Sequence, residues 1–207
     1  MSSSMSASFE ALLLAGGHSR RMGVDKAFLI WQGCPLWQHQ TGLLLSLQPR
    51  SLIISARWEQ VPDFGVMVET SPHRWHFDPA SEYSPMEAID KALIGCGRSA
   101  LLVLAVDLPH MRAEILRSLV EHWQNTGRGL VYDIEGQGQP LTALYPGTIS
   151  GLVHEFVRRR NLRLQALVRE GVAQGFLDLQ PLPAEWVPAF FNTNTPEEWD
   201  QARQPPT

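Results

Sequence analysis

The pattern of apolar positions predicts strands that alternate with helices along the chain. Continuous apolar runs, typical of strands buried on both faces of a parallel sheet, occur at residues 9–15, 51–56, 65–69, 100–107, 129–134 and 139–146. Apolar residues at helical spacing predict helices at residues 35–47, 86–95, 113–124, 149–160 and 162–171. This alternation favours a Rossmann-like, three-layer α/β/α sandwich with a mostly parallel sheet.

The two ends of the chain give further expectations. Residues 1–8 are polar and predict a disordered tail, so we expect a single domain over residues 9–207. Near the other end, the sequence predicts a strand end at Phe190 and Phe191 and then a loop. Thr195 is a suitable cap for a last helix, with Pro196 in its first position.

Composition and charge narrow the classes of protein and partner. The net charge is −4, and the one basic run, residues 158–160, is interpreted as a helix end, which argues against nucleic acid as a partner. No apolar run reaches the ~18 residues of a membrane span, and residues 11–15 are too short for a signal peptide. Cys34 and Cys96 have no metal-ligand spacing and are typical of reduced thiols, so we expect a cytoplasmic protein.

The first predicted strand is followed directly by a glycine turn and by cations. Gly16 and Gly17 come after the apolar run, and Arg20, Arg21 and Lys26 come next. Glycines let backbone N–H groups approach an oxyanion closely, and Arg and Lys bind phosphate. The spacing fits neither the dinucleotide fingerprint nor the Walker A loop. It therefore predicts phosphate binding of another kind, the alternative being an exposed loop with scattered charge.

Several motifs, in order, point to one family. The stretch "LAGGHSRRMGVDKA" at residues 14–27 resembles the signature loop of nucleotidyltransferases related to the molybdenum cofactor guanylyltransferase, which have a glycosyltransferase-A-like fold, also described as nucleotide-diphospho-sugar transferase-like. Four later segments resemble further motifs of that family: "GCPLWQH" (33–39), "AVDLP" (105–109), "QPLTALY" (139–145) and "NTNTPEE" (192–198). The blocks run from about residue 12 to residue 199, nearly the whole chain.

The resemblance implies an activity and a set of site residues. It implies a Mg²⁺-dependent enzyme that transfers GMP from GTP to molybdopterin, giving the guanine dinucleotide form and pyrophosphate, with a recipient molybdoenzyme or its chaperone as a further partner. Arg21, Lys26 and Asp107 would be catalytic, and Asp107 would also bind Mg²⁺, as a carboxylate at a strand end suits a hard cation. The nucleotide would contact these three residues and Leu14, Ala15, Gly16, Gly17, Ser55, Glu69 and Thr70. Asn192 and Asn194 would line the acceptor side.

Other interpretations of these residues stay open. Asp107 could cap the helix that follows, and Asn192 and Asn194 could serve a turn. The pair His73 and His76, with Asp78 nearby, could suggest a metal site, but no third ligand lies at a supporting spacing. We therefore interpret these histidines as solvated or as near an acidic substrate.

The chain also departs from the family pattern in ways that leave the substrates open. "SPMEA" at residues 84–88 replaces a segment with two glycines and adds Glu87, and Ser55 takes the place of a common Asn. The acidic position after the third strand falls near Glu69 and Thr70, and Arg163 is the counterpart of a family Arg. The alternatives are an enzyme that uses CTP or a sugar-phosphate acceptor, and a non-catalytic homologue that binds the cofactor.

Overall fold

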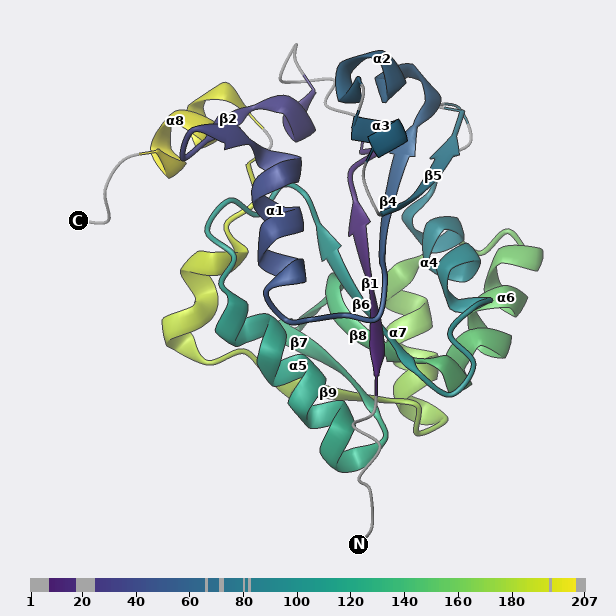
Figure 1. The fold of residues 1–207 in the computed structure, drawn as a ribbon. Helices are drawn as coiled ribbons and strands as arrows, with labels where there is room; N and C mark the ends of the chain where they lie inside the picture. Colours follow the sequence, from purple (N-terminus) through teal and green to yellow (C-terminus); the bar gives the residue numbers. More distant parts are fainter. Residues whose placement is uncertain are drawn as a thin grey trace, which may run out of the picture.

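A seven-stranded sheet forms the centre of the computed structural model, which describes residues 8–17, 25–65, 67–70, 73–79, 81, 83–193 and 195–203 (Figure 1). In spatial order its strands are β5 (Arg74–Asp78), β4 (Leu52–Arg57), β1 (Phe9–Leu14), β6 (Ala100–Ala105), β8 (Gln137–Pro146), β7 (Gly129–Ile134) and β9 (Leu177–Pro181). β8 runs antiparallel to both of its neighbours, whereas the other pairs are parallel. The expected mostly parallel sheet is confirmed.

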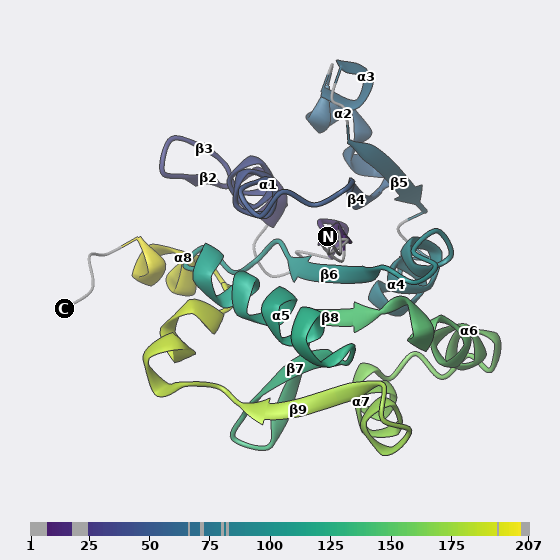
Figure 2. The same cartoon turned by 60° about the horizontal axis from the view of Figure 1, so that its bottom comes forward.

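Helices cover both faces of this sheet, as Figure 2 shows. One face carries α1 (Leu36–Leu45), α5 (Ala113–Thr126), the 3-10 helix η4 (Ala184–Phe190) and α8 (Pro196–Ala202). The other face carries α4 (Pro85–Leu93), α6 (Ser150–Arg158) and α7 (Leu164–Ala173). The shorter elements are η1 (Lys26–Phe28), β2 (Ile30–Trp31), β3 (Cys34–Pro35), η2 (Trp58–Gln60), α2 (Val61–Phe64), α3 (Met67–Thr70) and η3 (Gly147–Ile149).

Burial on both faces explains why the central strands are apolar throughout. All six residues of β1 are buried, with Leu13 in the cluster on the α1 and α5 side and Leu12 in the cluster on the α4 side. Successive side chains of a strand point to opposite faces, so a strand between two helical layers needs apolar residues at every position. This arrangement confirms the expected three-layer sandwich.

The predicted third strand was wrong. Residues 67–69 of the predicted strand 65–69 belong to α3, and the strand is β5, which follows α3 along the chain. Trp75 and Phe77 stack with ring centroids 5.6 Å apart, and Trp75 also contacts Phe64 at 4.8 Å, so alternate residues of β5 pack on the core. His76 and Asp78 lie at the intervening positions. The strand therefore has a polar face, and it breaks the continuous apolar pattern from which strands were predicted.

Differences near the C-terminus have similar causes. β9 was not predicted, because it lies at an edge of the sheet and alternates Leu177 and Leu179 with polar residues. The expected strand end at Phe190 and Phe191 was wrong, since η4 runs up to Phe190. The predicted cap of the last helix is confirmed, because the Thr195 side chain accepts a hydrogen bond from the backbone of Glu198 at 3.2 Å. Within the described residues, no helix is long and apolar enough to cross a membrane.

Candidate active site

The carboxyl ends of β1, β4 and β6 meet at one edge of the sheet, at the top of Figure 1. In open α/β sheets this edge is where ligands bind. The turn after β1 is held from both sides, because the Ala15 N–H donates to Ser55 O at 2.8 Å and the Val106 N–H donates to Leu14 O at 3.1 Å. Those groups of Leu14 and Ala15 are therefore already bonded within the protein. Gly16 is buried and Gly17 is exposed.

A lysine and an aspartate from distant parts of the chain form an ion pair at this edge. Lys26 Nζ lies 3.2 Å from Asp107 Oδ2, and the two side chains are 12% and 21% exposed. Lys26 opens η1, and Asp107 lies two residues beyond β6. The alternative that Asp107 caps the next helix was wrong, because α5 begins at Ala113 after Arg112. The structure thus brings together two of the three predicted catalytic side chains.

Tyr83 covers the glycine turn, a contact that the sequence analysis missed. Its hydroxyl accepts a hydrogen bond from the Gly16 N–H at 3.2 Å, and its ring lies where a side chain at position 16 would be. Burial raises the pKa of Tyr83 to about 12, although its contacts with Ser55 and with the Gly16 amide act in the opposite direction. The phenol is therefore neutral near pH 7.

A cavity of about 620 Å³ opens on the other side of Asp107. Asn192 and Arg163 both line it, together with residues 137–142 at the start of β8. The loop that carries Asn192 is tied to the ion pair, since the Thr193 N–H donates to Asp107 O at 3.2 Å. Because β6 lies between β1 and β8 in the sheet, Asp107 lies between the glycine turn after β1 and this cavity at the start of β8.

Comparison with known proteins gives the family. The sequence model of the family described as "MobA-like NTP transferase domain" matches residues 11–174. The chain belongs to this family. A protein of Opitutus terrae named "Probable molybdenum cofactor guanylyltransferase" is 32% identical over 97% of this chain and 98% of its own length. A protein of Rhizobium leguminosarum named "Molybdenum cofactor guanylyltransferase" is 26% identical over 93% of this chain and 90% of its own length.

Solved structures give the fold independently of sequence. Molybdopterin-guanine dinucleotide biosynthesis protein A from Archaeoglobus fulgidus superimposes with a TM-score of 0.73, at 19% identity, over 94% of this chain and 96% of that one. A putative glucose-1-phosphate thymidylyltransferase from Bacillus anthracis gives a TM-score of 0.71, at 14% identity, over 97% of both chains. The expected nucleotidyltransferase fold is confirmed.

Some residues that the resemblance to the MobA-like family assigned are buried, lie in another element than expected, or lie outside the described part of the chain. Arg21 and Asn194 are among the residues that the structure does not describe. Ser55 is fully buried and lies two residues before the end of β4. Glu69 and Thr70 belong to α3, so the expectation that they follow the third strand was wrong. The strand found instead of the predicted third strand is β5, and it ends in an acidic residue of its own.

That residue is Asp78, which the sequence analysis weighed only as a metal ligand. It ends β5 opposite Arg57 in the strand register and forms an ion pair with Lys91 of α4. The signal that could have found it is the alternation of β5, which places His76 and Asp78 on one face. Within the described residues no group of three or more His, Cys, Asp or Glu side chains is arranged for a metal.

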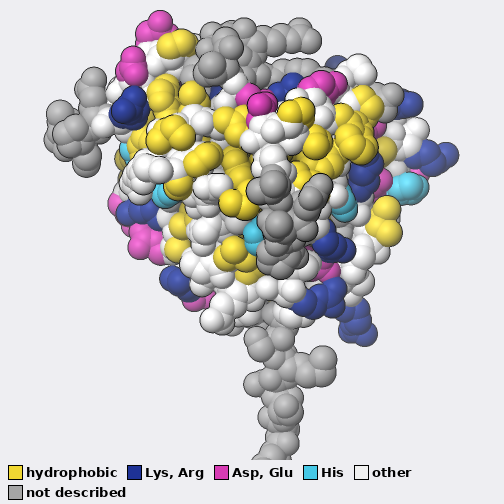
Figure 3. Space-filling view, turned by 45° about the horizontal axis from the view of Figure 1, so that its top comes forward, with side chains coloured by type: hydrophobic (Ala, Val, Ile, Leu, Met, Phe, Trp, Pro, Cys, Tyr) yellow, Lys and Arg dark blue, Asp and Glu magenta, His cyan; other side chains and the backbone are white. Residues whose placement is uncertain are grey.

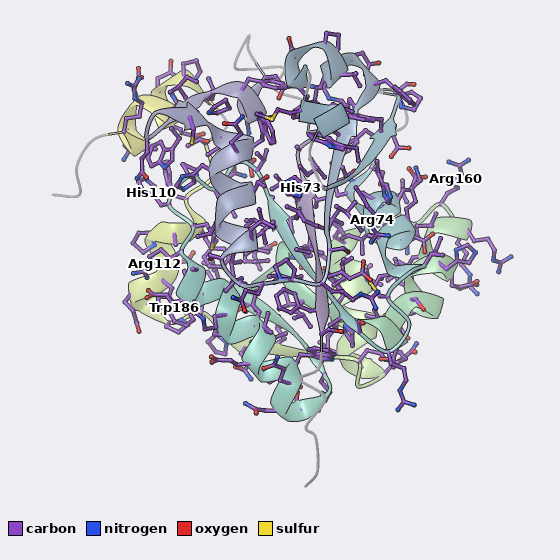
Figure 4. The ribbon with its side chains drawn as sticks, viewed as in Figure 1. His73, Arg74, His110, Arg112, Arg160 and Trp186 are labelled. Carbon is purple, nitrogen blue, oxygen red and sulfur yellow. The ribbon has the colours of Figure 1, made fainter. Side chains whose placement is uncertain are left out.

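Charges elsewhere around the site are balanced locally. Glu87, the acidic residue in "SPMEA", lies 3.9 Å from Arg160, which extends outward beyond the end of α6 (Figure 4). Among the side chains coloured by type in Figure 3, many on this face are hydrophobic, and most of the Lys and Arg lie around its margin. Cys34 and Cys96 are free thiols, as expected.

Proposed function

We propose that this protein transfers GMP from GTP to molybdopterin. In this reaction an oxygen of the terminal phosphate of molybdopterin bonds to the α-phosphorus of GTP, and the bond from that phosphorus to the β-phosphate oxygen breaks, releasing pyrophosphate. The observation that carries the proposal is the Lys26–Asp107 pair, which lies between the glycine turn and a cavity large enough for a second substrate. The relatives are named for the molybdenum cofactor, of which molybdopterin is the organic part, and this supports molybdopterin as that substrate.

The residues at the pair fit a bound Mg²⁺. Asp107 offers a partly exposed carboxylate, an oxygen ligand that Mg²⁺ uses together with phosphate oxygens and water. Bound there, Mg²⁺ would neutralise charge on the triphosphate. The Lys26 ammonium would neutralise the remaining charge, as would Arg21, and placing such charges where they develop is the main source of catalysis in phosphoryl transfer.

We assign the two substrates to the two sides of Asp107. The triphosphate would lie along the turn at Gly16 and Gly17, and the acceptor would fill the cavity beside Asn192 and Arg163. Arginine binds phosphate with two parallel hydrogen bonds, so Arg163 suits the acceptor phosphate. Asn194 would complete this side.

We place recognition of the base at the ends of β4 and β5. The carboxylate of Asp78 is 15% exposed and can accept the two adjacent N–H groups of guanine, which cytosine and adenine do not both offer. Asp78 thus takes the role that was expected of Glu69 or Thr70, and Ser55 lies opposite His76, two residues before Asp78. We infer a cytoplasmic location, which the free thiols support. A recipient molybdoenzyme stays a prediction.

Nucleotide-dependent stabilisation and turnover test this function. GTP with Mg²⁺ at 100 times its Kd should stabilise the protein by about 2.7 kcal/mol, which is roughly 5–10 °C in Tm, whereas CTP and ATP should shift Tm less. Pyrophosphate release should then require molybdopterin. Lys26→Ala and Asp107→Ala should each lower turnover by at least ~100-fold with the fold intact. A larger shift with CTP, or GTP binding without turnover, would support the alternative enzyme or the non-catalytic homologue instead.

A further inference from the structure

Asp25, the residue before the Lys26 of the ion pair, is held by donors from three places. Its Oδ1 accepts a hydrogen bond from the Ala27 N–H at 3.1 Å, which caps η1. Its Oδ2 accepts from the Arg57 guanidinium and from the Gln60 amide, the latter at 2.9 Å. Arg57 ends β4 and Gln60 lies in η2, so Asp25 is bonded to a segment more than 30 residues away in sequence.

Gln60 joins these segments to the end of β1. Its side chain is buried, and its Nε2 donates both to Asp25 Oδ2 and to Ala15 O, each at 2.9 Å. Its Oε1 accepts from the Arg57 backbone N–H at 2.7 Å. One amide therefore connects the end of β1, the end of β4 and the start of η1. Such a fully bonded buried group fixes the segments that it joins, because breaking any bond leaves a polar atom without a partner.

This network determines where the Lys26 side chain begins. The carboxylate of Asp25 is held to Ala27 on one side and to Arg57 and Gln60 on the other, so the backbone of residues 25–27 has a fixed position. Burial raises the pKa of Asp25, while these hydrogen bonds act in the opposite direction. A lysine has a long flexible stem, so the location of its ammonium depends on a fixed backbone and on a partner such as Asp107.

We propose that Arg57 and Gln60 are positioning residues, which act through Asp25 to hold the Lys26 ammonium beside Asp107. Neither residue belongs to the motifs on which the proposed function depends. An effect of these two residues on nucleotide binding and turnover rests on the proposed function, since it requires that Lys26 binds the triphosphate. The positioning itself is a property of the free protein and can be measured without a nucleotide.

The lysine content of the chain makes a direct measurement simple. Lys26 and Lys91 are the two lysines of the sequence. Reductive methylation with ¹³C-formaldehyde would give NMR signals from these two amines and from the N-terminus. In the wild type, Lys26, which is 12% exposed, should react more slowly than Lys91, which is 47% exposed. Gln60→Ala should raise the rate at Lys26 several-fold and leave Lys91 unchanged; an unchanged rate at Lys26 would overturn the proposal.

A matched control separates positioning from general loss of stability. Glu10 is another buried carboxylate that accepts bonds from two arginines, Arg50 and Arg74, but it lies at the start of β1 at the opposite edge of the sheet. Glu10→Gln should lower Tm without changing the rate at Lys26. If Glu10→Gln raised the rate at Lys26 as much as Gln60→Ala does, the effect would be one of stability and the proposal would be wrong.

A double-mutant cycle tests the link to the nucleotide. Gln60→Ala should weaken the affinity for GTP and Mg²⁺ by roughly tenfold in the wild type, since small displacements of a positioned group have effects of this size or larger. In the Lys26→Ala background the same change should have no effect, because its target is missing. Equal effects in both backgrounds would refute the action through Lys26. If no GTP bound to any variant, the proposed function would fail, whereas the methylation rates would still decide the positioning.

Discussion

The contact between Tyr83 and the glycine turn predicts that a single methyl group at position 16 is costly. A Cβ built on Gly16 would lie 2.1 Å from Cε2 of Tyr83 and 2.5 Å from two further ring atoms. Ordinary contacts of a Cβ begin near 3.4 Å. In a Gly16→Ala variant the half-buried ring must therefore move by more than an ångström, and its hydroxyl must leave the Gly16 N–H.

The magnitude follows from these two changes. Overpacking of this kind typically costs about 1–3 kcal/mol, and loss of the hydrogen bond adds about 1 kcal/mol. Replacing glycine by alanine also reduces the conformational entropy of the unfolded chain, which offsets about 0.4–1 kcal/mol of this loss of stability. We expect Gly16→Ala to lower the free energy of unfolding by about 1–3 kcal/mol, equivalent to roughly 3–10 °C in Tm for a chain of this size.

Urea unfolding followed by tryptophan fluorescence would measure the loss, with Gly17→Ala as the control. Gly17 is the neighbouring glycine, and a Cβ there would meet no atom of the described residues within 4 Å, so its variant should be at least as stable as the wild type. In a Tyr83→Ala background the ring is gone, and Gly16→Ala should then cost almost nothing. The reasoning would be refuted if Gly16→Ala were as stable as Gly17→Ala, or if its cost were the same with and without Tyr83.

Three further predictions concern single side chains. Tyr145→Phe removes the buried O–H that donates to Pro140 O at 2.7 Å, so urea unfolding should show a loss of about 1–3 kcal/mol, and a loss near zero would contradict this. Burial, aided by the charges of neighbouring Arg and Lys side chains, lowers the pKa of His76 from 6.5, so the unfolded chain binds the proton more readily and stability falls as the pH drops below that value. A His76→Asn variant should therefore lose less Tm on acidification than the wild type, and an equal loss would count against the assignment. Thr195→Ala removes the bond to the Glu198 N–H and should lower stability by about 1 kcal/mol in thermal unfolding. An unchanged Tm would contradict the capping role of Thr195.

Which strands could be predicted from the sequence depended on how many of their faces are buried. β1, β4 and β6 lie between two helical layers, so their sequences are apolar runs that are easily recognised. β5 and β9 are the outermost strands of the sheet, and each has a neighbouring strand on one side alone. Their polar positions break the runs, and period-two alternation would have been the better criterion. The two-residue strands β2 and β3 are too short to have a pattern of either kind.

For the site, local motifs were predictable and contacts between distant side chains were not. The glycine turn, Lys26 and Asp107 belong to contiguous motifs, and the carboxyl ends of parallel strands bring them to one edge. Tyr83 meets Gly16 across 67 positions and Gln60 meets Asp25 across 35. Such pairs depend on how the segments between them fold, and no local pattern in the sequence marks them.

The antiparallel direction of β8 assigns the two substrates to different parts of the chain. Because β8 starts at the edge where β1 and β6 end, its first residues face the same ligand region from the far side of Asp107. Everything that we assign to GTP lies at or before Asp107, and everything that we assign to the acceptor alone comes from residues 137–194. Grafting that later segment from a relative should therefore transplant the preference for the second substrate while the choice of nucleotide stays with the host.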